Sequence, residues 1–215
     1  MHIQSGFRAP APQQVKSAGV GQLLNAMQPA AVTLYAPDAE IYAQGDKAGP
    51  LYYVEFGTVR ICRLTADGRR QISAFHIAGE VFGFEAASEH DSFAESVDGA
   101  GIRVLRPSCG EIPAQSLLTL ALQSLTRTQH HLLVLGRRTA NERMAALLVD
   151  LNDRQNGAGL VHLPMQRNDI ADYLGVTFET VSRILRALKD QGLIRMKSVS
   201  EIELADLDAL SAMCD

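Results

Sequence analysis

The most informative part of this sequence is MQRNDIADYLGVTFETVSRILRALKDQ, which covers residues 165–191. In its second half, apolar side chains recur at i, i+3, i+4 and i+7, a spacing that predicts a helix with one buried stripe. The members of this stripe are Val181, Ile184, Leu185 and Leu188. In its first half, Ile170, Ala171 and Leu174 form a shorter inward face. Gly175 permits a backbone turn between the two helices, and Thr177 is a suitable N-cap for the second. The stretch therefore predicts a helix-turn-helix.

The opposite face of the second helix carries side chains that suit the edges of DNA bases. Glu179, Ser182 and Arg183 lie at i, i+3 and i+4 and project from one patch. Arginine can donate two hydrogen bonds to guanine, glutamate accepts one from cytosine, and serine adapts to either. An ordinary helical hairpin with a solvated polar face would have the same periodicity. The following stretch LIRMKSVSEIEL (residues 193–204) favours DNA binding, because two short strands around a polar turn at residues 198–200 would form a wing.

Charge along the chain also favours binding to double-stranded DNA. The 215 residues have a formal net charge of −4, which by itself argues against a DNA-binding protein. Residues 178–197, however, contain five basic and two acidic side chains and are net +3. Phosphates respond to this local potential rather than to the total charge. We expect phosphate contacts from Thr177, Arg186, Lys189 and Arg167. We expect base contacts from Phe178, Glu179, Ser182 and Arg183.

The N-terminal half has an all-β pattern. Over residues 32–105, short apolar runs alternate with turn residues, and glycines recur at near-even spacing, at positions 45, 57, 68 and 79. The strands predicted most clearly are LYYVEFG (51–57), TVRICRL (58–64) and RQISAFHI (70–77). In the last of these, Ile72, Ala74 and His76 are expected to alternate with their neighbours. Short, regularly spaced strands indicate a barrel or jelly roll.

A long helix is expected between the two halves, over residues 115–138. One set of side chains steps by four, three, four and three, which is the heptad spacing of a helix–helix seam. The set is Leu118, Leu122, Leu125, Gln129 and Leu132. The alternative is a helix packed on its own β domain, and we expect Leu117, Leu120 and Leu133 to pack in that way. LGRRT (135–139) then marks a hinge into a further helix over residues 140–155.

These motifs resemble the CRP/FNR superfamily of bacterial transcription regulators. ETVSR (179–183), which follows DIADYLG (169–175), has the E-x-x-S-R pattern of FNR-type recognition helices. Four other stretches are similar to the FixK branch, namely IYAQGD (41–46), DGRRQI (67–72), GEVFGFEA (79–86) and QHHLLVLGRR (129–138). The resemblance covers the chain from about Leu34 to the C-terminus.

The resemblance implies an α+β chain in three parts. A double-stranded β-roll (jelly roll) of the cyclic-nucleotide-binding type would occupy residues 31–114, a dimerisation helix 115–138, and a winged helix-turn-helix 139–215. Residues 1–30 are small, polar and Pro-rich and are expected to form a mobile leader. The resemblance also implies a homodimer that binds TTGA-N6-TCAA-like palindromes and works with RNA polymerase, as an activator of nitrogen fixation and micro-oxic respiration genes. Arg183 would contact the guanine, and Glu179 the cytosine of the opposite strand.

The cyclic nucleotide that some members of the superfamily bind is disfavoured here. Their pocket has a glycine-glutamate turn followed by an arginine-serine pair, which neutralises the cyclic phosphate. Gly79 and Glu80 match the turn, but the later stretch SFAESV (92–97) has a glutamate and no basic residue. A carboxylate that faces a phosphate repels it.

Two other cofactors are also disfavoured, so we expect none. An FNR-type iron–sulfur cluster requires four thiolates, most of them close together in sequence. This chain has only Cys62, Cys109 and Cys214, without a C-x-x-C pair. Haem could in principle be ligated by His76, His90, His130 or His131. Lone histidines on strands or helices, however, are more often packing residues than ligands.

The remaining motifs exclude some classes of protein. The sequence has no nucleophile elbow, no phosphate-binding glycine loop and no zinc-ligand spacing, so we expect no enzyme. It has no apolar stretch long enough to span a membrane and no signal-peptide pattern, so we expect a cytoplasmic protein. Two hypotheses remain. The first is a dimeric, sequence-specific transcription regulator. The second is a β-roll that senses haem or a nucleotide and acts through a protein partner.

Overall fold

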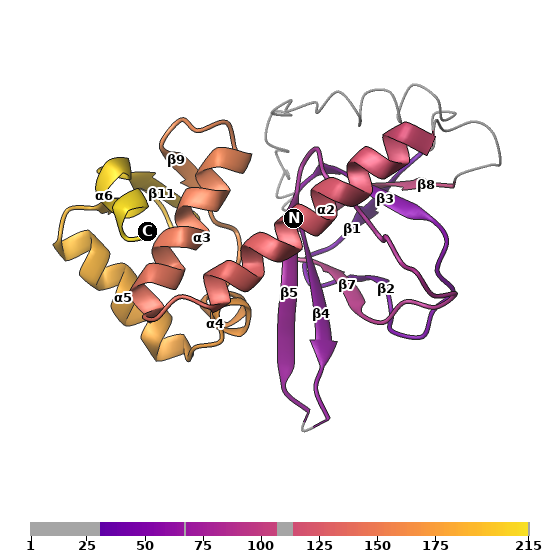
Figure 1. The fold of residues 1–215 in the computed structure, drawn as a ribbon, viewed down its shortest axis with the longest axis horizontal. Coiled ribbons are helices and arrows are strands. Elements are labelled where there is room, and N and C mark those ends of the chain that lie inside the picture. The colour runs from indigo at the N-terminus through magenta and orange to yellow at the C-terminus, as the bar shows by residue number, and fades with distance from the viewer. Residues whose placement is uncertain (1–30, 67, 107–113, 215) are drawn as a thin grey trace, which may run out of the picture.

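The chain folds into two lobes that are joined by one long helix (Figure 1). The computed structural model describes residues 31–66, 68–106 and 114–214. The leader predicted over residues 1–30 and the third cysteine, Cys109, lie outside the described residues. Strands make up the N-terminal lobe, and helices with a small sheet make up the C-terminal lobe.

The described N-terminal lobe contains two four-stranded antiparallel sheets, with strand orders β1-β8-β3-β6 and β2-β7-β4-β5. Their strands are β1 (Val32–Tyr35), β2 (Glu40–Tyr42), β3 (Leu51–Phe56), β4 (Thr58–Leu64), β5 (Arg70–Ile77), β6 (Val81–Phe82), β7 (Phe93–Ser96) and β8 (Ala100–Leu105). The three strands predicted most clearly are confirmed as β3, β4 and β5. Gly57 makes the turn between β3 and β4 at φ +82, where a Cβ atom would lie 2.0 Å from the Gly99 carbonyl oxygen.

Aromatic rings fill the space between the two sheets. Tyr42 stacks on His90 with ring centroids 3.7 Å apart, and Tyr52 stacks on Phe82 at 5.2 Å. All four side chains are buried. This region of the roll is therefore a packed core built from both sheets.

The alternation predicted for β5 holds only in its first half. Ile72 is buried and Gln71 and Ser73 are exposed, but Phe75, His76 and Ile77 are buried in succession. The register shifts within β5, because Ile61 pairs with Ala74 but Cys62 pairs with Ile72, which leaves Ser73 as the extra residue of a β-bulge. The end of β5 is also covered on its second face, because Phe75 packs against Tyr173 of the C-terminal lobe.

The connecting helix α2 (Ala114–Leu135) ends three residues earlier than predicted, and Gly136 follows it. Leu120 is buried and Leu117 half-buried against the roll, as predicted. The same prediction is wrong for Leu133, whose exposed fraction is 64%. The last turns of α2 extend beyond the apolar cluster of the roll. In these turns His131 and Val134 contact the C-terminal lobe instead.

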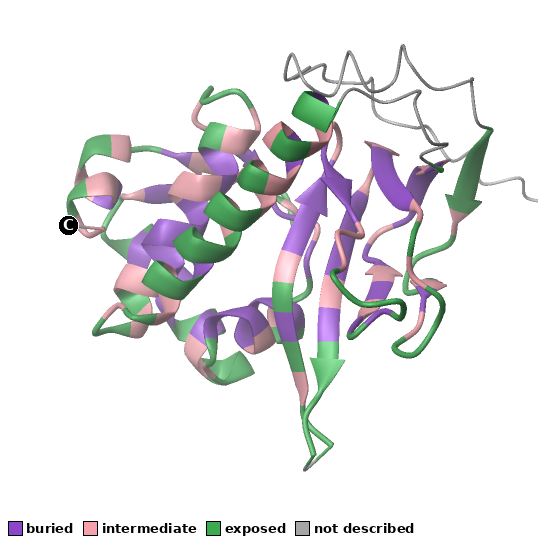
Figure 2. Ribbon diagram, turned by 45° about the vertical axis from the view of Figure 1, so that its right-hand side comes forward, coloured by how far each residue is buried: buried purple, intermediate pink, exposed green. Residues whose placement is uncertain are grey.

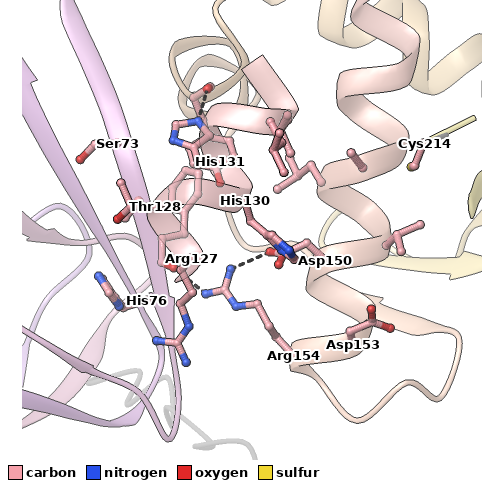
Figure 3. Close-up of a pocket in the computed structure, with 18 of the residues that line it drawn as sticks. Ser73, His76, Arg127, Thr128, His130, His131, Asp150, Asp153, Arg154 and Cys214 are labelled. Carbon is pink, nitrogen blue, oxygen red and sulfur yellow. Dashed lines mark hydrogen bonds and ion pairs between the residues drawn. The ribbon is translucent and has the colours of Figure 1, made fainter. Parts of the chain in front are cut away.

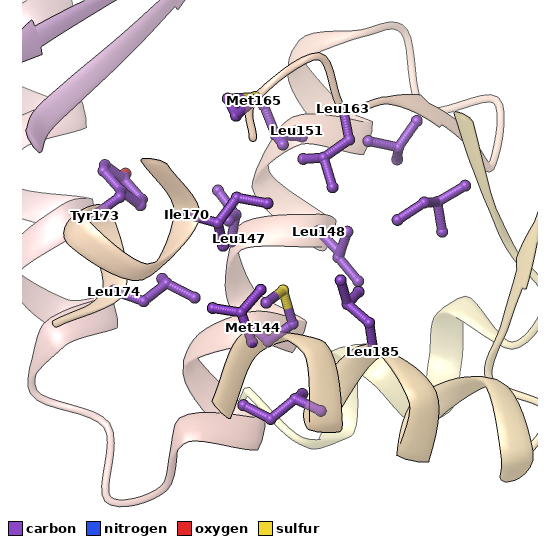
Figure 4. Close-up of a cluster of buried hydrophobic side chains, with 14 of the residues drawn as sticks. Met144, Leu147, Leu148, Leu151, Leu163, Met165, Ile170, Tyr173, Leu174 and Leu185 are labelled. Atoms are coloured by element: carbon purple, nitrogen blue, oxygen red, sulfur yellow. The ribbon is translucent and has the colours of Figure 1, made fainter. Parts of the chain in front are cut away.

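The C-terminal lobe is a winged helix-turn-helix. Its elements are α3 (Ala140–Arg154), β9 (Leu160–His162), α4 (Arg167–Leu174), α5 (Phe178–Asp190), β10 (Ile194–Met196), β11 (Glu201–Leu204) and α6 (Leu207–Ala212). The two predicted wing strands are confirmed as β10 and β11, and β9 adds a third strand that was not predicted. Thr139 and Glu142 form a capping box that starts α3. Side chains of α3, α4 and α5 share one apolar core, in which Met144, Leu148, Ile170 and Leu185 are buried (Figure 4).

Candidate DNA-binding interface

The turn between α4 and α5 has the local structure that its sequence predicts. Gly175 adopts φ +64, the left-handed conformation that glycine tolerates best, and ends α4. The Thr180 N–H donates to the Thr177 hydroxyl at 3.3 Å, so Thr177 caps α5. These two residues set the direction in which α5 leaves the turn.

Helix α5 buries one face and leaves the other open. The predicted apolar stripe is buried against α3 and α4. The side chains predicted to contact DNA from this helix are exposed; they are Phe178, Glu179, Ser182, Arg183, Arg186 and Lys189. Thr177 is exposed at its start, whereas Arg167 is half-buried at the start of α4. Hydrogen bonds from its own N–H and from the Thr177 hydroxyl hold the pKa of Glu179 below its usual range, so this carboxylate is a hydrogen-bond acceptor.

The wing carries less free positive charge than the sequence count implies. Lys197 Nζ lies 2.6 Å from Glu203 Oε2, and Arg195 Nη1 lies 3.1 Å from Glu203 Oε1. Glu203 stands on β11, outside the window over which the +3 was counted. The turn at residues 198–200 is open to solvent, and Val199 at its tip is 90% exposed.

The predicted heptad seam runs along the open side of α2 (Figure 2). Its four leucines, Leu118, Leu122, Leu125 and Leu132, are 52–64% exposed in the single chain, and Gln129 is exposed among them. A row of large apolar side chains left in water in this way indicates a surface that another molecule covers.

Glu80 joins the roll to the helices. Arg154 of α3 reaches Glu80 Oε1 with Nε at 3.1 Å and Oε2 with Nη2 at 3.0 Å, and Arg127 of α2 reaches Oε1 at 3.2 Å. Burial alone would raise the pKa of Glu80, but Arg154, His76 and Arg127 hold it well below its usual range. The glutamate that resembles part of a nucleotide pocket is thus bound by arginines of its own chain. Sequence alone did not indicate this contact, because Glu80 and Arg154 are far apart along the chain.

Among the residues considered for other cofactors, His131 and Cys62 are buried. His131 Nε2 donates a 3.0 Å hydrogen bond to the Tyr173 carbonyl oxygen, and the His131 ring stacks on the Tyr173 ring at 3.9 Å. His76, Arg127 and His131 line a cavity of about 330 Å³ between β5, α2 and α3 (Figure 3). Burial and the nearby Glu95 raise the pKa of the Cys62 thiol to about 11. Within the described ranges, no group of three or more His, Cys, Asp or Glu is placed to hold a metal ion. The described helices also include none that could cross a membrane.

Two families match this chain, and together they cover both lobes. Residues 142–213 match the Crp-like helix-turn-helix domain, and residues 32–124 match the cyclic nucleotide-binding domain. The chain is 47% identical to the nitrogen fixation regulation protein FixK of Rhizobium meliloti (strain 1021), over 87% of this chain and 89% of that protein. It is 40% identical to the FixK protein of Azorhizobium caulinodans, over 91% and 83%.

A solved structure agrees with these sequence matches. FixK2 from Bradyrhizobium japonicum superposes with a TM-score of 0.81 at 37% identity, over 87% of this chain and 98% of that one. The recognition helix, the wing and the β-roll therefore occur together here as they do in a known group of proteins. The chain belongs to the CRP/FNR family of DNA-binding transcription regulators, in its FixK branch, and it is not an enzyme.

Proposed function

We propose that this protein is a homodimeric activator that binds TTGA-N6-TCAA-like palindromes and controls nitrogen fixation and micro-oxic respiration genes. The observation that carries the proposal is the open polar face of α5, on which Glu179, Ser182 and Arg183 are all exposed. The FixK relatives support the choice of genes, because they are named as nitrogen fixation regulation proteins. A β-roll sensor that acts through a protein partner is not favoured, since it gives this open face no role.

The bases of each half-site would be read from the first two turns of α5. Arg183 donates to guanine O6 and N7, and Glu179 accepts from the N4 amino group of the opposite cytosine. Ser182 contributes an adaptable hydrogen bond, and the exposed ring of Phe178 can contact a thymine methyl group. Thr177, Arg186, Lys189 and Arg167 would bind the flanking phosphates and fix the register of α5 on the duplex.

Dimerisation would place two such helices on one face of the DNA. Two α2 helices can bury the leucine seam against each other around a two-fold axis, with Gln129 fixing their register. The two copies of α5 then meet half-sites one helical turn apart, which makes the site a palindrome. RNA polymerase is the partner expected for the outer surface of the bound dimer, in the cytoplasm where the DNA lies.

The protein would need no effector for this activity. Glu80 already binds Arg154 and Arg127, and Glu95 of β7 binds Arg60 at 2.7 Å. Because these arginines are paired with carboxylates of the same chain, they do not form a free cationic site for a cyclic phosphate. Control would then depend on how much protein the cell makes.

In vitro transcription tests the proposal directly. A template with the palindrome upstream of a promoter is transcribed by bacterial RNA polymerase, with and without the purified protein. We expect more transcript only when both the protein and the intact palindrome are present, and no change on addition of cyclic AMP. Transcript that is insensitive to loss of the palindrome, or that rises only with cyclic AMP, would refute the proposal.

A further inference from the structure

Helix α4, the first helix of the helix-turn-helix, is attached to the β-roll by ion pairs. Two aspartates of α4 face the β4–β5 hairpin, which lies beside it (Figure 1). Arg60 Nη1 of β4 lies 3.1 Å from Asp169 Oδ2. Arg70 of β5 donates to Asp172 Oδ2 from Nε at 2.9 Å, and its Nη2 contacts Asp169 Oδ1. We call these four residues the roll–α4 clamp.

Two members of the clamp, Asp169 and Arg60, are buried, and its charges depend on one another. Asp169 is 2% exposed and receives one arginine on each carboxylate oxygen. Arg60 is also buried and is shared with two acids of the roll, Glu95 at 2.7 Å and Asp38 at 2.9 Å. Four carboxylates therefore surround two guanidinium groups. Loss of Arg70 would leave four carboxylates around the single guanidinium of Arg60, so Asp169 would keep a buried charge that is only partly compensated.

Apolar contacts hold α4 from two further directions. The ring of Tyr173 packs on Phe75 of β5 with centroids 5.1 Å apart, and stacks on His131 of α2 at 3.9 Å. Helix α5 packs on α4 through the shared apolar core. The orientation of α5 relative to the roll and to α2 is therefore transmitted through α4, while the recognition face itself remains uncovered.

We infer that Arg60 and Arg70 are positioning residues for DNA recognition. By holding α4 on the roll, the clamp sets the recognition helix at a fixed angle to α2, the helix that would carry the dimer axis. Together with the Glu80–Arg154 pair between the roll and α3, this contact would do what a bound effector could otherwise do. The inference rests on the proposed dimer, in which that angle decides the distance between the two copies of α5.

A dimer with a loosened clamp should bind DNA less well and tolerate more arrangements of half-sites. The apparent affinity is the intrinsic affinity multiplied by the fraction of molecules that hold the competent orientation. A protein that merely lost stability would lose affinity equally for every duplex. Discrimination between spacers of different length therefore separates a positioning role from a structural one.

The test compares Arg70→Gln with Arg103→Gln. Arg103 is a matched control, because it pairs with Glu55 inside the roll and its side chain is 26% exposed, against 28% for Arg70. Each purified dimer is titrated with duplexes whose TTGA and TCAA half-sites are separated by five, six or seven base pairs. Thermal melting confirms that each variant is folded, and ultracentrifugation gives its oligomeric state. Asp172→Asn provides a second variant that breaks the clamp from the α4 side.

If about a tenth of the molecules keep the competent orientation, Arg70→Gln and Asp172→Asn should lose roughly tenfold in affinity for the duplex with the six-base-pair spacer. Both variants should also lose most of the preference for this duplex over those with five or seven base pairs. Arg103→Gln should match the parent. If the parent dimer clearly prefers one spacer length and both clamp variants keep that preference, the inference is overturned while the proposed dimer stands. Tighter binding by either variant would have the same consequence. A parent that is monomeric, or that shows no preference for spacing, would overturn the proposed dimer and the inference together.

Discussion

Arg154 on α3 binds both carboxylate oxygens of Glu80, at 3.1 and 3.0 Å, across the junction between the C-terminal lobe and the roll. The same guanidinium donates to the Phe75 carbonyl at 2.6 Å and to Asp150 at 2.9 Å. Its N–H groups therefore bind three different residues. A buried arginine with this many charged and carbonyl partners gives the junction one preferred geometry. Stability of the whole chain should therefore depend on Glu80.

Replacement of Glu80 by glutamine should destabilise the protein by about 3 kcal/mol, because it leaves Arg154 buried without its main counter-charge. Glu55→Gln is the control, since Glu55 forms a partly exposed ion pair with Arg103, and such a loss costs about 1 kcal/mol or less. Urea unfolding followed by circular dichroism gives both values. Equal losses for the two variants would show that the Glu80 contact contributes no more than a surface pair.

Stability should decline as pH falls below neutrality. Burial holds the pKa of His76 and of His131 below the ordinary 6.5, so both stay neutral in the folded chain while the unfolded chain binds protons. The contribution of the two neutral histidines to the free energy of unfolding is present above about pH 6.5 and is lost as the pH falls below that value. Glu80, whose pKa is also depressed, adds a second loss below its ordinary value of 4.5.

Urea midpoints at neutral and mildly acidic pH measure the first of these losses. We expect a lower midpoint at the acidic pH, and a smaller difference in His131→Gln, which removes one of the two histidines. A midpoint that rises on acidification would mean that these histidines gain protons on folding, opposite to the expected sign.

Arg183→Ala should lose about 1–3 kcal/mol of binding free energy on the palindrome and relax the choice of base at the guanine. Arg186→Ala is the comparison, because a phosphate contact should weaken binding to all sequences equally. Titration against duplexes with each base at that position measures both effects. If Arg183→Ala retained the parent's preference for guanine, the assignment of Arg183 to this base would be wrong.

Leu125→Glu should convert the dimer to a monomer, because it would place two like charges beside the two-fold axis at a cost of several kcal/mol. Leu64→Glu is a fair control, since Leu64 is 57% exposed on β4, away from the seam, and Leu125 is 52% exposed. Sedimentation velocity distinguishes the two states. A Leu125→Glu protein that still sediments as a dimer would place the interface elsewhere.

Local features of the C-terminal lobe were predictable from sequence because short-range rules determine them. The stripe on α5, the turn at Gly175 and the cap at Thr177 each depend on residues within a few positions of one another. The resemblance to a known family supplied the architecture of the roll. Strand β9 and helix α6 are too short for a periodic signal, and neither was predicted.

Contacts between the lobes could not be predicted in the same way. The pairs Glu80–Arg154 and Arg60–Asp169 join residues far apart in sequence, and no local pattern links their members. Leu133 continues the apolar pattern of α2, yet it is exposed because the roll's apolar cluster ends before that turn of the helix. Glu203, which offsets the charge of the wing, lies only six residues from Lys197 and was missed because charge was counted over residues 178–197 alone.

Recognition of a palindrome by α5 without an effector can be tested in one titration. A fluorescent TTGA-N6-TCAA duplex and a scrambled duplex of equal composition are titrated with the purified protein at physiological salt, with and without cyclic AMP. We expect binding to the palindrome to be at least about a thousandfold tighter than to the scrambled duplex, and to be unchanged by the nucleotide. Equal affinity for the two duplexes, or a preference that appears only with cyclic AMP, would contradict it.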